Sequence, residues 1–333
     1  MNESKPILGV TMGDASGAGP EIVIKALTVP DIRATCRPVV IGDAATLCQA
    51  ARIVGSDVRI HGISDIAQAT LDEDVIEVID LRNIDLNRLE YAKVQAMTGQ
   101  AAYDCVVKAV ELALAGEIAA IVTSALHKEA LNLAGHHFPG HTELLAHLCG
   151  VHSVAMMLVA GEFRVSHVST HCSLREAIDR VQKDRILEVV RLTDTALRRM
   201  GVAEPRIAVA GLNPHAGEGG LFGDEENREI RPAVAAAVAD GFACVGPIPP
   251  DTVFFRITRG QYDAVVAMYH DQGHIPTKVL AFDTGVNVTL GLPIIRTSVD
   301  HGTVFGKAGK GTARPGSLIE ALKLAAKMAA RSA

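Results

Sequence analysis

Short apolar runs alternate along the chain with longer amphipathic stretches. Runs rich in β-branched residues predict buried strands at 7–12, 37–42, 119–124, 153–160, 206–211 and 264–269. Alanine-rich stretches predict helices at 99–115, 173–200 and 226–239. This alternation is typical of an α/β fold with largely parallel sheets, and the runs are too apolar for strands that keep one face in water.

Glycine and proline cluster in the segments that follow several predicted strands. They are GDASGAGP (13–20), FPGH (138–141), GLNPHAGEGG (211–220), GPIPPDT (246–252) and DQGHIP (271–276). Because ligands of open α/β sheets bind beyond the carboxyl ends of the strands, we expect the functional residues in these loops. The chain has no internal repeat and no flexible linker, so its division should be a crevice between packed lobes.

Three histidines, His171, His215 and His270, each sit just beyond a short β-type run, in the segments SHVSTH, IAVAGLNPH and AVVAMYH. If these strands are neighbours in one sheet, the imidazoles converge at its rim and form an open metal site. Neutral imidazole suits zinc, nickel, cobalt or iron(II), and three protein ligands leave a position for substrate, as in catalytic metal sites. The alternative is that these residues, three of 13 histidines, only cap or hydrogen-bond the loops.

Composition limits the class of protein. The 333 residues are 48% hydrophobic, enough for one large two-lobed unit, and no apolar run reaches the roughly 18 residues of a membrane span. Six cysteines without paired spacing and an N-terminus without a leader pattern predict a soluble protein of the reduced cytoplasm. A net charge of −6, 4% aromatic residues and no tryptophan argue against nucleic-acid binding. A small phosphorylated ligand fits this composition.

Two loops have both a ligand-binding and a structural interpretation. The segment Gly13–Glu21 could hold a ligand at a helix N-terminus or could be a tight strand-to-helix turn. It is not GxGxxG, and no P-loop motif occurs in the chain. His141 and Thr142 precede a predicted helix, where they could bind an anion or simply cap the helix.

Several polar residues late in the chain are further candidates. Lys278, Asn287 and Arg296 supply an ammonium, an amide and a guanidinium, the usual mixture for binding phosphate or carboxylate, although each alone could be a surface or salt-bridged residue. Asp251 could orient a ligand histidine, or it could cap a helix that begins at Thr252.

The segment 269–274 places His270 and His274 four residues apart, so on a helix both would face the same way. Gly273 and Pro276 argue against a regular helix there. His270 is the better ligand candidate, and we expect His274 to line the crevice or the surface.

Taken together, these segments closely resemble the 4-hydroxythreonine-4-phosphate dehydrogenase family of the vitamin B6 pathway. The matching stretches are MGDASGAGPEI, TSALHKEAL, FPGHTELLA, GLNPHAGEGG, GPIPPDTVF, MYHDQGHIPTK and VNVTLGLPIIRTSVDHGT, spread from residue 12 to residue 303.

The resemblance implies two α/β/α lobes around a central cleft, as in isocitrate and isopropylmalate dehydrogenases. We place the first lobe at 1–135 plus 297–333 and the second at 136–296. It also implies a homodimer with a shared active site and NAD bound without a Rossmann fingerprint. His171, His215 and His270, the last from the partner subunit, would hold one divalent ion (Zn, Mg, Mn, Co or Ni). The residues implied to contact the phosphorylated substrate are His141, Thr142, Lys278, Asn287 and Arg296.

The chain departs from the family pattern at three places. GDASGAGPE replaces the usual GDPAGIGPE, TSALHKEA replaces TAPINKEA and introduces His127, and Gly306-Lys307 stands where an acidic residue is usual. These differences favour the related D-threonate or D-erythronate 4-phosphate dehydrogenases of sugar-acid catabolism.

The reaction so implied is oxidation of a phosphorylated four-carbon 3-hydroxy acid, with hydride transfer to NAD, followed by decarboxylation to dihydroxyacetone phosphate. The general base is unassigned among Lys278, Asp251, His141 and a metal-bound hydroxide. The alternatives are 4-hydroxy-L-threonine 4-phosphate as substrate, an unphosphorylated dihydrodiol carboxylate, a hydrolytic metalloenzyme, and a metal- or ligand-binding regulatory protein without activity.

Overall fold

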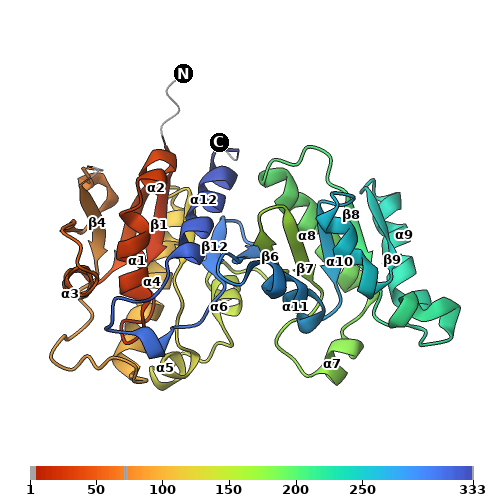
Figure 1. Cartoon of the computed structure of the whole chain (residues 1–333), viewed down its shortest axis with the longest axis horizontal. Helices are drawn as coiled ribbons and strands as arrows, with labels where there is room; N and C mark the ends of the chain where they lie inside the picture. The colour runs from red at the N-terminus through yellow and green to blue at the C-terminus, as the bar shows by residue number, and fades with distance from the viewer. Residues whose placement is uncertain (1–4, 71, 73, 332–333) are drawn as a thin grey trace. The chain divides into compact units, whose positions relative to one another are not determined.

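A computed structural model describes residues 5–70, 72 and 74–331. It divides into two compact α/β units (Figure 1). Unit 1 comprises the chain up to His152 and from Leu292 onward, and unit 2 comprises Ser153–Gly291. This division lies later along the chain than the boundary expected at 135 and earlier than the one expected at 296, so Arg296 belongs to unit 1.

Unit 1 is built on an all-parallel sheet of order β3-β4-β2-β1-β5-β12. Its strands are β1 (Ile7–Thr11), β2 (Arg37–Gly42), β3 (Arg59–Ile63), β4 (Val75–Asp80), β5 (Ala120–Thr123) and β12 (Arg296–Val299). Its helical segments are α1 (Gly19–Leu27), α2 (Pro30–Thr35), α3 (Ala44–Val54), η1 (Ile66–Gln68), α4 (Ala96–Leu114), α5 (Lys128–Leu133), α6 (His141–Leu148), η4 (Phe305–Lys307) and α12 (Gly316–Ala329). The sheet changes winding direction between β1 and β5, which both lie in the core.

Unit 2 has the strand order β11-β6-β7-β10-β8-β9. Its strands are β6 (Ala155–Ala160), β7 (Phe163–His167), β8 (Ile207–Ala210), β9 (Cys244–Ile248), β10 (Ala264–Ala267) and β11 (Val286–Leu290). Its helical segments are α7 (Leu174–Asp179), α8 (Lys183–Arg199), η2 (Pro214–Gly220), η3 (Glu226–Ile230), α9 (Arg231–Ala239), α10 (Pro250–Thr258) and α11 (His270–Ala281). β7, β10, β8 and β9 run parallel, whereas β6 is antiparallel to β7 and to β11.

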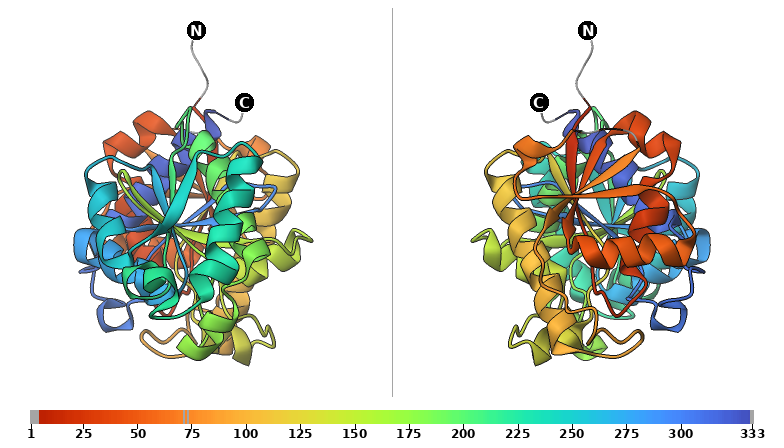
Figure 2. Two further views of the ribbon diagram at one scale, coloured as in Figure 1. Left: turned by 90° about the vertical axis from the view of Figure 1, so that its right-hand side faces the viewer. Right: turned by 90° about the vertical axis from the view of Figure 1, so that its left-hand side faces the viewer.

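Helices cover the sheet of each unit on both sides (Figure 2). In unit 2, Val253 and Ile257 of α10 pack in one buried cluster with Val165 and Val265 of neighbouring strands. Burial on both faces explains why these strands read as continuous apolar runs. Among the described residues no helix is long and apolar enough to cross a membrane.

All six predicted strands are present, at β1, β2, β5, β6, β8 and β10. Two helix predictions need correction. The stretch 173–200 is divided into α7 and α8, and the segment from His270 is a helix despite Gly273 and Pro276. Gly273 is required there, because a Cβ at this position would lie 2.3 Å from Nε2 of His167.

Candidate active site

The strands that precede the three candidate histidines are neighbours, which is the condition under which the histidines were expected to converge. β10 pairs in parallel with β7 on one side and with β8 on the other. His171, His270 and His215 follow these strands at the same carboxyl edge of the unit 2 sheet. This is the edge at which α/β sheets bind ligands.

His270 and His171 lie close together, with ring centroids 5.7 Å apart. His270 begins α11, and its Nδ1 donates a hydrogen bond of 2.6 Å to Oδ1 of Asp271. This bond leaves Nε2 of His270 as the free ring nitrogen, in the arrangement that a carboxylate partner gives to metal-binding imidazoles. Asp271 therefore orients His270, a role for which the sequence had suggested Asp251.

His274 lies against His270 and is 7% exposed, so it does not line the surface, which was one of the two positions expected from the sequence. The rings stack with centroids 3.6 Å apart, and Nδ1 of His274 lies 3.0 Å from the carbonyl oxygen of His270. Behind it, His167 is 1% exposed and its Nε2 has no hydrogen-bond partner. Burial lowers the pKa of His167 to about 3 and that of His274 to about 4, and neighbouring histidines act in the same direction.

His215 lies in a loop with unusual backbone conformation. The six residues from His215 to Gly220 all have positive φ, although three of them are not glycine. The buried carboxylate of Glu226 holds the start of this loop, because it accepts hydrogen bonds from the backbone N–H groups of Leu212 and Asn213 and from the Asn213 amide. Such a strained segment persists only where its surroundings fix it.

Within the described part of one chain, no group of three His, Cys, Asp or Glu side chains lies close enough to bind one metal ion. The structure thus brings His171 and His270 together and leaves His215 apart, exposed and beside Phe222. The residues still suit a divalent ion. Imidazole is a ligand for such ions, and the ring of His270 is hydrogen-bonded to a carboxylate, as is usual for metal-binding histidines.

Unit 1 brings two of the expected substrate residues, Arg296 and His141, close together. Arg296, 2% exposed at the start of β12, donates hydrogen bonds from Nε and Nη2 to Oγ1 of Thr123 at 3.1 and 2.7 Å. Burial lowers the pKa of Arg296 to about 9, an effect that Glu143 opposes. Burial, together with the positive charge of Arg296, holds the pKa of His141 well below its usual range. The pair is therefore a cation beside a neutral imidazole.

The remaining expected residues are distributed as follows. Thr142 lies in the first turn of α6, whose N-cap is Gly140, so Thr142 is not the helix cap. Lys278 lies in the last turn of α11, with its Nζ 5.8 Å from the centre of the Phe282 ring. Asn287 is half-buried in β11 of unit 2, and Asp251 is exposed in the first turn of α10.

The glycine-rich loop after β1 packs as a turn. Asp14 is fully buried, and its Oδ1 accepts a hydrogen bond of 2.8 Å from the N–H of Ser16. The carboxylate of Glu21 accepts hydrogen bonds from the N–H groups of Gly309 and Gly311, which ties α1 to the segment after η4. His127, the residue by which this chain departs from the family pattern, stacks on Phe305 with centroids 4.9 Å apart.

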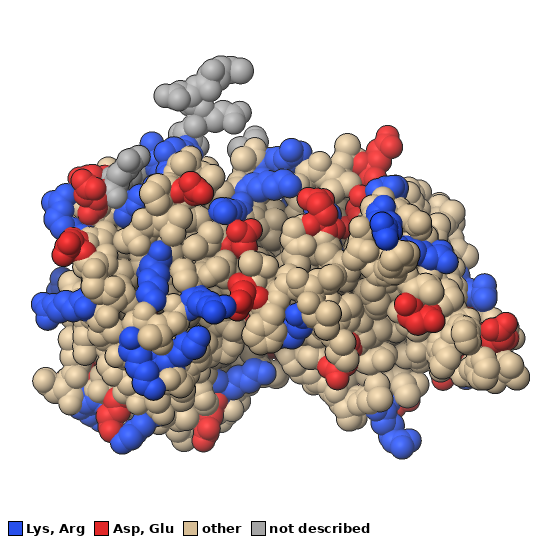
Figure 3. Space-filling model, in the orientation of Figure 1, with Lys and Arg blue, Asp and Glu red and all other residues tan. Residues whose placement is uncertain are grey.

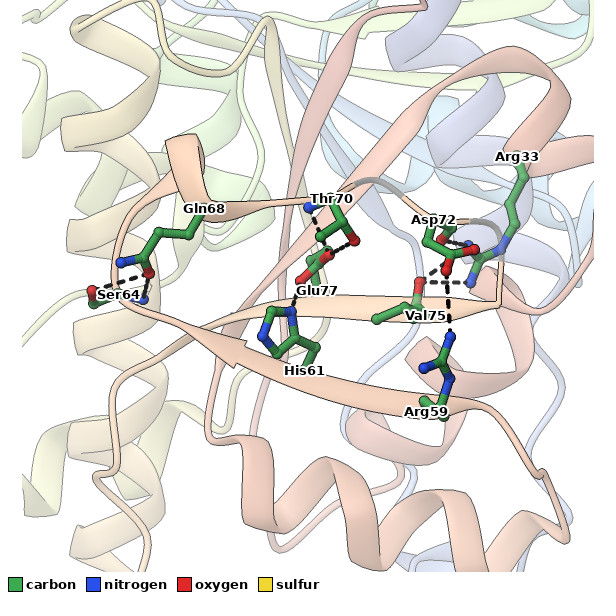
Figure 4. Close-up of polar contacts among 9 residues, drawn as sticks. All are labelled: Arg33, Arg59, His61, Ser64, Gln68, Thr70, Asp72, Val75 and Glu77. Atoms are coloured by element: carbon green, nitrogen blue, oxygen red, sulfur yellow. Dashed lines mark hydrogen bonds and ion pairs between the residues drawn. The ribbon is translucent and has the colours of Figure 1, made fainter.

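A cavity of about 130 Å³ lies at the opposite, amino edge of the unit 1 sheet, beside the first residues of β2 and β4. Its polar groups serve the fold (Figure 4). Glu77 accepts hydrogen bonds from His61 and Thr70, and the guanidinium of Arg33 donates to the backbone of Asp72 and Val75. On the face in Figure 3, basic and acidic side chains are interspersed within each unit.

Comparison with known proteins decides the family. The family model described as "Pyridoxal phosphate biosynthetic protein PdxA" matches residues 34–325. The chain belongs to the PdxA family. It is 49% identical to the D-threonate 4-phosphate dehydrogenase of Cupriavidus necator over 100% of both chains. It is 45% identical to the 4-hydroxythreonine-4-phosphate dehydrogenase of Geobacter metallireducens, over 99% of this chain and 97% of that one.

Solved structures agree with this placement in the PdxA family. The 4-hydroxythreonine-4-phosphate dehydrogenase of Klebsiella pneumoniae superposes with a TM-score of 0.88 at 48% identity, over 98% of this chain and 100% of that one. A terephthalate 1,2-cis-dihydrodiol dehydrogenase from Burkholderia xenovorans gives 0.68 at 29% identity, over 97% and 98%. A β-decarboxylating dehydrogenase from Thermococcus kodakarensis shares the fold, with a TM-score of 0.50 at 13% identity over 94% and 80%.

These findings show a dehydrogenase that acts on a CH–OH group of a phosphorylated hydroxy acid, and such an enzyme uses a nicotinamide cofactor.

Sequence reasoning found the histidine strands but missed Asp271 and Thr123 as partners of His270 and Arg296. The proximity of Asp271 to His270 was a usable signal, whereas no sequence signal places Thr123 beside Arg296.

Proposed function

We propose that this protein catalyses the NAD- and metal-dependent oxidative decarboxylation of D-threonate 4-phosphate, or of D-erythronate 4-phosphate, to dihydroxyacetone phosphate and CO₂. The observation that carries the proposal is the 49% identity, over the whole of both chains, to a D-threonate 4-phosphate dehydrogenase. The chemistry of the residues supports it, because a buried guanidinium can bind a phosphate and imidazoles can hold a divalent ion.

We infer that His171, His215 and His270 hold one divalent ion. When bound, this ion supplies a Lewis acid that lowers the pKa of the substrate hydroxyl. Asp271 holds the Nδ1 proton of His270, which leaves Nε2 of that ring to bind a metal. NAD is the acceptor of the hydride.

The residues proposed to bind the phosphorylated substrate are His141, Thr142, Lys278, Asn287 and Arg296. Arg296 retains its charge at neutral pH because its pKa, although lowered, is about 9. Its Thr123 contact fixes the guanidinium. Binding at a phosphate remote from the reacting carbon uses binding energy to orient the substrate. Lys278 and Asp251 are the candidate bases, and the assignment between them stays a prediction.

In a homodimer with a shared active site, the three histidines of one site need not come from a single chain. Helix α11 begins with His270 and exposes a large apolar surface, which consists of Ile275, Val279, Leu280 and the following Phe282. Apolar surface of this extent on a single helix is typical of subunit interfaces. We therefore propose that α11 contacts a second copy of the chain and presents His270 to the partner's site.

One assay tests the function. Purified protein is incubated with NAD and each of the two sugar-acid phosphates, with and without a chelator, and NADH is followed at 340 nm. We expect chelator-sensitive NADH formation and equimolar dihydroxyacetone phosphate. Activity that is restricted to 4-hydroxy-L-threonine 4-phosphate would instead support the reaction for which the Geobacter relative is named.

A second candidate substrate is a cyclic dihydrodiol carboxylate. The observation that favours it is the 29% identity to the Burkholderia dihydrodiol dehydrogenase, whose TM-score is 0.68. The same assay with a phosphate-free diol separates the two candidate substrates, because the diol has no phosphate for Arg296 to bind. Turnover of the diol at the higher kcat/KM would establish the second candidate.

A further inference from the structure

A continuous chain of three hydrogen bonds crosses the carboxyl edge of the unit 2 sheet. Oγ of Ser169 donates to the carbonyl oxygen of Met268 at 3.0 Å. The N–H of Met268 donates to Oε1 of Gln272 at 2.7 Å, and Nε2 of Gln272 donates to the carbonyl oxygen of Gly211 at 2.7 Å. All four residues are buried.

The residues of this hydrogen-bond chain come from the three segments that carry the candidate histidines. Ser169 precedes His171 by two residues, Met268 precedes His270 by two, and Gly211 precedes His215 by four. Gln272 lies in the first turn of α11, two residues after His270. The hydrogen-bond chain therefore connects the three loops that carry the proposed metal ligands.

The chain of bonds begins where the strand ladders end. The last paired residues are His167 with Ala267 and Val209 with Val266. Ser169, Met268 and Gly211 all lie just beyond these pairs. The side-chain bonds therefore extend the alignment of the sheet into the loops.

We infer that Gln272 and Ser169 are positioning residues, which set the mutual placement of the His171, His215 and His270 loops. The inference rests on the proposed metal-binding role of these histidines. Gln272 suits the task because an amide is a donor at one end and an acceptor at the other, and its partners here are one carbonyl and one N–H. In a buried site, loss of either bond leaves a backbone group without a partner.

The experiment uses full-length protein with Gln272→Met, Gln272→Glu and Ser169→Ala. Gln272→Met keeps the side-chain length and removes both bonds, whereas Gln272→Glu keeps the acceptor for Met268 and loses the donor to Gly211. The matched control is Thr193→Val, which removes a buried hydrogen bond of 2.7 Å to Ser166 within the same unit but outside the chain of bonds. Two readouts are used: the dissociation constant for Co²⁺ by calorimetry, and hydrogen exchange of the metal-free protein.

We expect Gln272→Met to weaken Co²⁺ binding by about tenfold or more, and Ser169→Ala by about threefold, values typical for residues that support metal ligands. Gln272→Met should also accelerate amide exchange in the His171 loop, to which Gln272 is connected through Met268 and Ser169. Thr193→Val should change neither. Exchange that is faster only next to residue 272, or Co²⁺ affinity within twofold of wild type in both Gln272 variants, would overturn the inference.

Failure of the proposed function gives a different result. If the wild-type protein does not bind Co²⁺, the metal proposal fails, and the exchange measurement still decides whether Gln272 connects the three loops. If Gln272→Met does not fold, Gln272→Glu and Ser169→Ala carry the same comparison, since each removes a single hydrogen bond.

Discussion

At the scale of single residues, Arg296 makes the sharpest prediction for substrate binding. Arg296→Ala should lower kcat/KM for the phosphorylated substrate by about 100-fold or more, because a buried guanidinium that meets a phosphate contributes several kcal/mol. Arg296→Lys keeps a positive charge but not the planar guanidinium, so its kcat/KM should lie between the values of wild type and Arg296→Ala. Arg37→Ala, which changes an exposed arginine, is the control. Unchanged kcat/KM in a folded Arg296→Ala protein would remove Arg296 from the site.

The lowered pKa of His167 leads to a prediction of how the free energy of unfolding depends on pH. In the folded protein its pKa is about 3, whereas the unfolded imidazole takes up a proton near its ordinary pKa of 6.5. The unfolded state thus binds more protons between these values, so the free energy of unfolding falls as the pH drops from 6.5 towards 3. One such group contributes roughly 1.4 kcal/mol per pH unit, or roughly 2 kcal/mol between pH 6.5 and 5.

The measurement is urea unfolding of the metal-free protein at pH 7 and pH 5. His167→Leu should remove roughly 2 kcal/mol of the difference between the two pH values. His152→Leu, at an exposed histidine, should leave the difference as in wild type. An equal loss of stability at pH 5 in His167→Leu and wild type would contradict the assignment.

At the residue scale, the sequence located candidate side chains better than it located their hydrogen-bond partners. His171 and His270 were found because each follows a β-type run, a local signal. The contact between Arg296 and Thr123 joins residues more than 170 positions apart, and it follows from the pairing of β12 with β5, which no local pattern encodes. The left-handed run at His215 depends likewise on the remote carboxylate of Glu226.

At the scale of elements, α11 depends on a glycine that sequence reasoning took as evidence against a helix. A Cβ at residue 273 would lie 2.3 Å from Nε2 of His167 and 2.7 Å from Cγ1 of Val165. Gly273→Ala should therefore destabilise the protein by roughly 3 kcal/mol, since the buried neighbours must shift. Gly306→Ala is the matched control, because a Cβ there meets nothing within 4 Å and its φ is ordinary. Similar urea midpoints for the two variants would show that α11 can move away from β7.

Strands were predictable from the sequence where burial requires a run of apolar residues. All six apolar runs became strands, because their burial on both faces requires continuous apolar sequence. The helix from His270 was not predictable by composition. It forms because Gly273, His274 and Thr277 are buried on one face of it, and this packing outweighs the cost of Pro276.

At the scale of the whole molecule, the exposed apolar surface of α11 predicts the oligomeric state. Val279 is 80% exposed and Phe282 is 77% exposed. If α11 contacts a second copy, Val279→Asp should convert the dimer to monomers in sedimentation velocity, because a charge would be buried at the interface. Leu133→Asp, at a 59% exposed leucine of unit 1, is the control and should stay dimeric.

A shared site makes a stronger prediction than dimerisation alone. If each site takes His171 and His215 from one subunit and His270 from its partner, then His171→Ala and His270→Ala are each inactive as homodimers. In a mixed dimer of the two variants, one site carries both substitutions and the other carries neither, so activity should return to about half that of wild type per dimer. Sites built within single chains would stay inactive after mixing, because every chain carries one substitution. Co-expression with two different affinity tags isolates the mixed dimer, and NADH formation together with bound Co²⁺ per dimer measures the recovery.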